Sequence, residues 1–144
     1  MKKIIKKMYI VMMISALGIT GLFTFTPSAS AASGCSDTST GSDYQKIFSV
    51  CGTDSGDNVI GSIKPSGKGT YGKNYWKMDL QRYENGSYKT IGTRTGYIDW
   101  GSPSSRTFTN VLKKNAKTRI KVSFYTDSSY STVNGTVYSG YWYR

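Results

Sequence analysis

The chain has 144 residues, with 19 lysines and arginines against 8 acidic residues, and its formal net charge is +11 at pH 7. This length accommodates one small domain behind an export signal. The sequence contains no histidine, which excludes the usual general base of serine and cysteine hydrolases and the commonest zinc ligand.

Residues 1–31 have the three parts of a secretory signal peptide. Four lysines within the first seven residues precede an uncharged run, residues 8–25, and small residues follow. Ala29-Ser30-Ala31 matches the A-x-A cleavage pattern. We therefore expect cleavage after Ala31 or Ala32 and secretion of the remainder. The style of the signal suggests a Gram-positive producer.

Two cysteines, Cys35 and Cys51, lie in the exported part. Lipid modification of Cys35 is the alternative to a disulfide, because the residues just before it are small. However, the leucine-like position of lipoprotein signals is not matched, and Pro27 and a polar stretch separate Cys35 from the apolar run. An even pair outside the cytoplasm predicts one disulfide, Cys35–Cys51. Its loop of about 17 residues corresponds to roughly 3 kcal/mol in the chain-entropy model.

Without residues 1–31 the chain keeps 15 basic and 8 acidic residues, a net charge of +7. Residues 32–57 are rich in Ser, Thr, Gly and Asp. They predict a loop-like polar segment held by the disulfide, with a short strand at residues 44–50. Residues 58–144 are expected to form the core, and residues 32–144 together are expected to form one domain.

From residue 58 onward the pattern indicates β-structure. Two stretches, residues 76–80 and 119–125, alternate apolar and polar residues, as half-buried strands do. Asn85-Gly86 predicts a tight hairpin, with residues 88–95 as its returning strand. The apolar members of the two stretches are expected to be buried: Trp76, Met78, Leu80, Ile120, Val122 and Phe124.

The spacing of turn signals predicts an all-β fold. Six to eight short antiparallel strands without a helix indicate a small single-domain β-sandwich of immunoglobulin-like or jelly-roll-like type. Residues 108–111, a basic turn and residues 119–125 resemble the E–F part of an immunoglobulin-like or fibronectin-type-III-like sandwich. This resemblance covers under a fifth of the chain and implies architecture only.

The sequence contains no recognisable catalytic set. No serine lies in a G-x-S-x-G elbow. Asp54 and Asp57 form a close carboxylate pair in an Asp/Gly/Asn loop, but the loop lacks the EF-hand spacing, and such loops are usually plain turns. Residues 61–68 resemble a phosphate loop but have five residues between the glycines instead of four. We predict no enzyme activity, no metal, no cofactor and no bound nucleotide.

The densest group of cations lies in residues 113–121. No acidic residue lies between Asp99 and Asp127 to neutralise it, so it would concentrate positive potential at one end of the sandwich. The predicted polyanion-binding residues are Lys113, Lys114, Lys117, Arg119 and Lys121.

Aromatic residues form the second candidate surface. The pattern Gly-Thr-x₄-Tyr-Trp occurs twice, ending at Trp76 and at Trp142. Strand alternation places these tryptophans inside and the tyrosines beside them outside. Exposed rings flanked by Lys or Arg stack on sugar rings or bases while the cations hold phosphates. The predicted aromatic binding residues are Tyr75, Tyr97, Trp100, Tyr141 and Tyr143.

These observations predict a secreted cationic β-sandwich that binds an anionic cell-wall polymer or membrane surface and acts as a bacteriocin-like antibacterial. Two alternatives stay open. One is an inhibitor of a secreted hydrolase, which would bind its protein target through a rigid loop at residues 61–73 or 96–105. The other is a structural matrix or coat protein that assembles through exposed strand edges.

Overall fold

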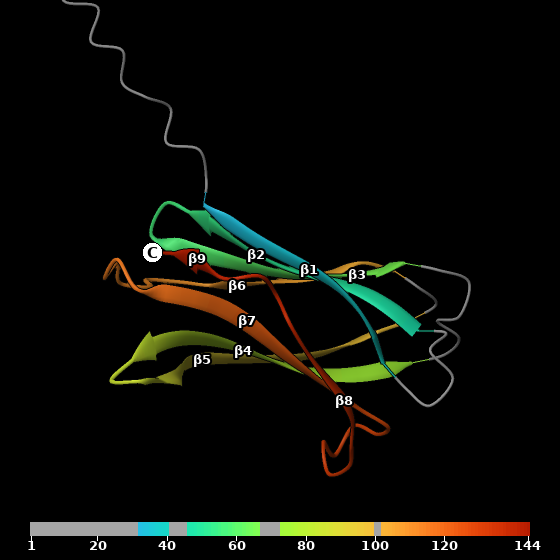
Figure 1. Ribbon diagram of the computed structural model, residues 1–144. Coiled ribbons are helices and arrows are strands. Elements are labelled where there is room, and N and C mark those ends of the chain that lie inside the picture. The colour runs from blue at the N-terminus through green and yellow to red at the C-terminus, as the bar shows by residue number, and fades with distance from the viewer. Residues whose placement is uncertain (1–31, 41–45, 67–72, 100–101) are drawn as a thin grey trace, which may run out of the picture.

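Two antiparallel sheets make up the computed structural model (Figure 1), which describes residues 32–40, 46–66, 73–99 and 102–144. The first sheet has the strand order β1-β2-β3-β6, formed by β1 (Ser33–Thr40), β2 (Lys46–Ser55), β3 (Asn58–Ser66) and β6 (Ser104–Phe108). The second has the order β5-β4-β7-β8, with β9 also paired to β7; its strands are β4 (Asn74–Glu84), β5 (Ser87–Ile98), β7 (Lys117–Tyr125), β8 (Val133–Tyr138) and β9 (Trp142–Tyr143). The predicted all-β fold is confirmed, with nine strands among these residues where six to eight were expected.

The core lies between the two sheets. Alternate residues of each strand point inward, and all six apolar residues of the two alternating stretches are buried, as predicted: Trp76, Met78, Leu80, Ile120, Val122 and Phe124. Trp142 is buried too, which confirms its predicted orientation. The stacked rings of Phe48 and Phe124, with centroids 4.4 Å apart, join the first sheet to the second.

The segment at residues 32–57 is not the loop-like segment expected from its composition. It forms the β1–β2 hairpin, in which Cys35 and Cys51 are direct cross-strand partners with Cα atoms 4.1 Å apart, and the predicted disulfide joins them. Buried Phe48 and Val50 alternate with partly exposed Ser49 and Cys51. Buried glycines at inward positions, Gly34 and Gly52, hid this period of two in the sequence, because they carry no apolar side chain. The strand expected at residues 44–50 is present from residue 46, and residues 41–45 lie outside the described part.

The Asn85-Gly86 hairpin between β4 and β5 is confirmed. Both residues have positive φ, 52° and 81°, as a two-residue hairpin turn with this sequence requires. Other segments expected to be loops belong to strands, since residues 61–66 lie in β3 and residues 96–98 lie in β5. Residues 104–105 lie in β6. Of the two loops expected for an inhibitor, residues 67–72 and 100–101 lie outside the described part.

A buried arginine closes one end of the sandwich. The Arg144 side chain is fully buried, and its Nη1 lies 2.8 Å from Asp54 Oδ1. Its Nη2 donates a hydrogen bond to the carbonyl of Val111 at 2.7 Å. Trp142 Nε1 donates to the same Asp54 oxygen at 2.9 Å. The Asp54 carboxylate that stood out in the sequence therefore serves as the partner of Arg144 and Trp142.

The Asp54–Arg144 pair provides a test of the fold. Asp54→Ala leaves the Arg144 guanidinium buried without its counter-charge, so we expect the free energy of unfolding to fall by about 3 kcal/mol. Urea unfolding of the disulfide-bonded protein measures this change. The matched control is Asp57→Ala, which removes an exposed carboxylate two residues beyond β2 and is expected to change stability by no more than about 0.5 kcal/mol. Equal effects of the two substitutions would contradict the role assigned to the pair.

Candidate binding face on the second sheet

Tyrosines and cations gather on the outer face of the second sheet. Strand alternation and the cross-strand register place these side chains opposite the buried core residues. We call this surface the tyrosine–cation face, and its members are Tyr75, Lys77, Gln81, Tyr83, Tyr88, Tyr97, Lys117, Arg119, Lys121, Tyr125, Tyr138, Tyr141 and Tyr143.

Arg119 lies on this face between two aromatic rings. Its guanidinium carbon is 3.6 Å from the ring centroid of Tyr88 and 4.2 Å from that of Tyr138. Its Nε donates a hydrogen bond to Gln81 Oε1 at 3.0 Å. Stacking and this hydrogen bond hold the guanidinium in one place, which reduces the side-chain entropy that a ligand would have to remove.

Two predicted lysines flank Arg119. Lys117 Nζ lies 4.9 Å from the ring centroid of Tyr141, and Lys117 is the cross-strand partner of Tyr143. Lys121 is the partner of Tyr138 on β8. The structure therefore brings three of the predicted cations together with two of the predicted aromatic residues.

Sequence reasoning missed Tyr88 and Tyr138, the two residues that hold Arg119. Tyr88 lies on β5 and Tyr138 on β8, which are the outer strands of the β5-β4-β7-β8 path. The observed register places both side chains on the outer side of the sheet. Their convergence on Arg119 depends on the order of four strands, which no short sequence pattern contains.

The other two predicted cations lie elsewhere. Lys113 and Lys114 belong to the connection between β6 and β7, and both line hollows beside Leu112. Lys114 Nζ lies 3.4 Å from Glu84 Oε1. The predicted polyanion set is thus divided between the tyrosine–cation face and this connection.

The remaining predicted tyrosines form a second cluster at the far end of the same face. The ring centroids of Tyr75 and Tyr97 are 6.3 Å apart, and Lys73 Nζ lies 5.1 Å from the Tyr97 ring. Tyr75 pairs with Tyr125, eight residues along β7 from Lys117, so the two clusters are about 26 Å apart at the rise of an extended strand. Trp100 lies outside the described residues.

The face carries an excess of positive charge. It carries four cations, Lys77, Lys117, Arg119 and Lys121. The carboxylate of Asp79, the cross-strand partner of Lys121, lies on the same side of the sheet. Asp79 accepts a hydrogen bond from Thr93 Oγ1 at 2.7 Å. Because one carboxylate neutralises only part of the charge of four cations, the face offers an extended positive surface with aromatic rings at both ends.

Comparison of the chain with protein-family models, with curated proteins and with solved structures gives no match. Within the described ranges, no helix is long and apolar enough to span a membrane. No group of three or more His, Cys, Asp or Glu residues that could hold a metal ion occurs in that part of the chain. The functional inference therefore rests on the residues of the face itself.

Asp127 organises the connection that carries Tyr130, whose ring packs edge-on against Tyr75 and Tyr125. The Asp127 carboxylate accepts hydrogen bonds from the Ser129 hydroxyl and from the Ser129 backbone N–H, the latter at 2.8 Å. The hydrogen bond from the Ser129 side chain is the main reason that the pKa of Asp127 lies below its ordinary value.

The order of this connection should depend on pH in a defined direction. Because folding lowers the pKa of Asp127, its contribution is complete above the unfolded pKa and is lost as the pH falls through the folded pKa. We expect the NMR signals of the Tyr130 ring to stay constant from pH 7 to pH 5 and to move only below the ordinary aspartate value of 3.8. Asp127→Asn should abolish that transition. A Tyr130 transition above this value would contradict the assignment.

Proposed function

We propose that this chain is a secreted, non-catalytic protein that binds an anionic polymer of the bacterial envelope through the tyrosine–cation face. The observation that carries the proposal is Arg119, fixed between Tyr88 and Tyr138 with Lys117 and Lys121 beside it. Guanidinium and ammonium groups bind phosphate or carboxylate, and tyrosine rings stack on sugars. This combination suits a polymer that carries both.

The dimensions of the face favour a polymer over a small ligand. Rings lie at both ends, at Tyr97 and at Tyr143, and cations lie between them. A separation of about 26 Å between the two clusters exceeds the size of a single sugar or phosphate. Several successive units of one chain would contact the whole face, and many weak contacts would add.

We further propose that the protein works outside the cytoplasm. The Cys35–Cys51 disulfide supports this location, because structural disulfides persist in oxidising compartments. The signal peptide predicted at residues 1–31 lies outside the described part and stays a prediction. Bacteriocin-like killing also stays a prediction, since binding alone explains the surface.

The finer fold that we propose is immunoglobulin-like. With β3 as strand B, β6 as E, β4 as C, β7 as F and β8 as G, the neighbours B–E and C–F–G match that arrangement. The resemblance seen in residues 108–111 and 119–125 then falls at the end of E and in F. Such an architecture implies no particular function, because one fold hosts many unrelated functions.

Co-sedimentation with Gram-positive sacculi tests the proposed function. The test variant is Lys117→Gln/Arg119→Gln/Lys121→Gln, and the matched control is Lys64→Gln/Lys89→Gln/Lys113→Gln, which removes three exposed cations outside the face. We expect the exported, oxidised protein to be retained at low salt and released as salt rises, because counterions screen the cations. The test variant should lose at least tenfold in affinity and the control less than threefold.

Removal of teichoic acids from the sacculi should abolish retention if they are the polymer. If the test variant and its control lose retention equally, binding depends on net charge alone and not on the tyrosine–cation face. No retention at low salt would contradict the proposal.

A further inference from the structure

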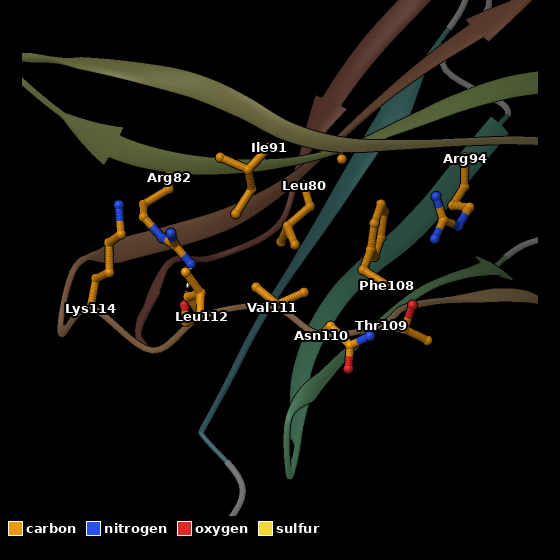
Figure 2. A pocket seen from close by; sticks show the side chains of 11 residues that line it. Leu80, Arg82, Ile91, Arg94, Phe108, Thr109, Asn110, Val111, Leu112 and Lys114 are labelled. Carbon is orange, nitrogen blue, oxygen red and sulfur yellow. Dashed lines mark hydrogen bonds between the residues drawn. The ribbon is translucent and has the colours of Figure 1, made fainter.

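A separate hollow opens on the side of the sandwich where the edge strands β5 and β6 face each other. It has a volume of about 280 Å³ and lies between the β4–β5 hairpin and the chain that leaves β6 (Figure 2). Leu80 and Ile91 border it from the second sheet, and Phe108, Val111 and Leu112 border it from the other side. Its walls are mixed, because polar and charged residues line it beside these apolar side chains. Ile91 and Leu112 are exposed to solvent.

Three cations line the same hollow: Arg82, Arg94 and Lys114. None of its lining residues is acidic. The carboxylate of Glu84 lies nearby, with Oε1 3.7 Å from Arg82 Nη1 and 3.4 Å from Lys114 Nζ. Three cations and one carboxylate lie in or beside the hollow, so its net charge is positive.

Arg82 is the unusual member of this group. Its side chain is only 4% exposed, and its Nη2 donates to the Leu112 carbonyl. Its buried Nε has no hydrogen-bond partner in the described part of the chain. A buried, incompletely paired guanidinium is costly unless an anion compensates it.

Arg94 is placed to contact such an anion directly. Its guanidinium carbon lies 5.1 Å from the Phe108 ring centroid. Its Nε donates to the Thr107 carbonyl at 3.2 Å and its Nη1 to the Thr93 carbonyl at 2.9 Å. These contacts fix the side chain, which lines the hollow and is partly exposed. Its terminal nitrogens carry further N–H donors for a headgroup.

We propose that this hollow binds a small amphiphilic anion, a carboxylate or phosphate carried on a short apolar chain. The headgroup is held by Arg94 within the field of Arg82 and Lys114, and the apolar chain lies against Leu80, Ile91 and Leu112. A hollow of about 280 Å³ is close to the size of small-molecule sites, and its mixed lining offers cations for the headgroup and apolar side chains for the chain. This site is distinct from the tyrosine–cation face and does not depend on the function proposed for it.

Titration of the exported, oxidised protein with four probes tests the proposal by NMR. Octanoate and octyl phosphate carry both features, octyl glucoside lacks the charge, and inorganic phosphate lacks the chain; all are used below their micelle concentrations. We expect both amphiphilic anions to shift the signals of Ile91, Arg94 and Leu112, at least tenfold more tightly than either single-feature probe. The tighter of the two anions identifies the headgroup.

The variants separate the site from general charge effects. Arg94→Gln should weaken binding of both amphiphilic anions about tenfold, as expected for loss of a charge-assisted hydrogen bond. Leu112→Gln, at a side chain that is 70% exposed, should weaken them without unfolding the protein. The matched control is Arg106→Gln, because Arg106 also stacks on a ring, that of Trp76 at 5.2 Å, but does not line the hollow.

We expect Arg106→Gln to bind both amphiphilic anions with unchanged affinity. Three results would overturn the proposal: octyl glucoside binding as tightly as the anions, equal weakening by Arg94→Gln and Arg106→Gln, or ligand shifts that miss Ile91 and Leu112.

Discussion

The architecture depends on one buried guanidinium. Arg144 joins Asp54 of β2 through its side chain and holds the carbonyl of Val111 in the β6–β7 connection. Its backbone N–H and carbonyl both bond to Ala116, just before β7 begins. A charge buried this deeply requires its partner, so the first sheet, the connection and the end of the chain adopt one mutual arrangement. Arg82, a second buried arginine, makes a similar contact with the same connection, because its Nη2 donates to the carbonyl of Leu112, the residue after Val111.

This arrangement determines where the binding residues lie. The Ala116–Arg144 bonds set the register of β9 on β7, which places Tyr143 beside Lys117 and brings Tyr141 under the Lys117 ammonium. On the opposite side, Gly34 lies against the backbone of Gly140 so closely that a Cβ would collide with it. The disulfide-linked hairpin therefore supports the segment that carries Tyr141. The outer face of the second sheet is therefore held in place by the Ala116–Arg144 hydrogen bonds and by the packing of Gly34 against Gly140.

Local patterns in the sequence were enough for the parts of the fold that depend on neighbours in the chain. Alternation identified the burial of Trp76 and Ile120, and Asn85-Gly86 identified the hairpin. The same reasoning missed β1 and much of β2, because the buried glycines Gly34 and Gly52 occupy inward positions where an apolar side chain would have marked a strand. It also missed the inward Arg82, since its hydrogen-bond partner, the Leu112 carbonyl, lies 30 residues away. The candidate site could be predicted only in part. Three of its cations occupy alternate positions of β7, which a local pattern shows, but the Tyr88–Arg119–Tyr138 stack requires the strand order of the whole sheet.

Mapping of amide chemical shifts during titration with a soluble teichoic acid tests most directly whether the second sheet is the binding surface. The predicted result is a set of shifts on β4, β5, β7 and β8, centred on Arg119 and reversed by high salt. β1, β2 and β3 should be unaffected. Shifts concentrated on those three strands, or none at low salt, would contradict the assignment of function to the tyrosine–cation face.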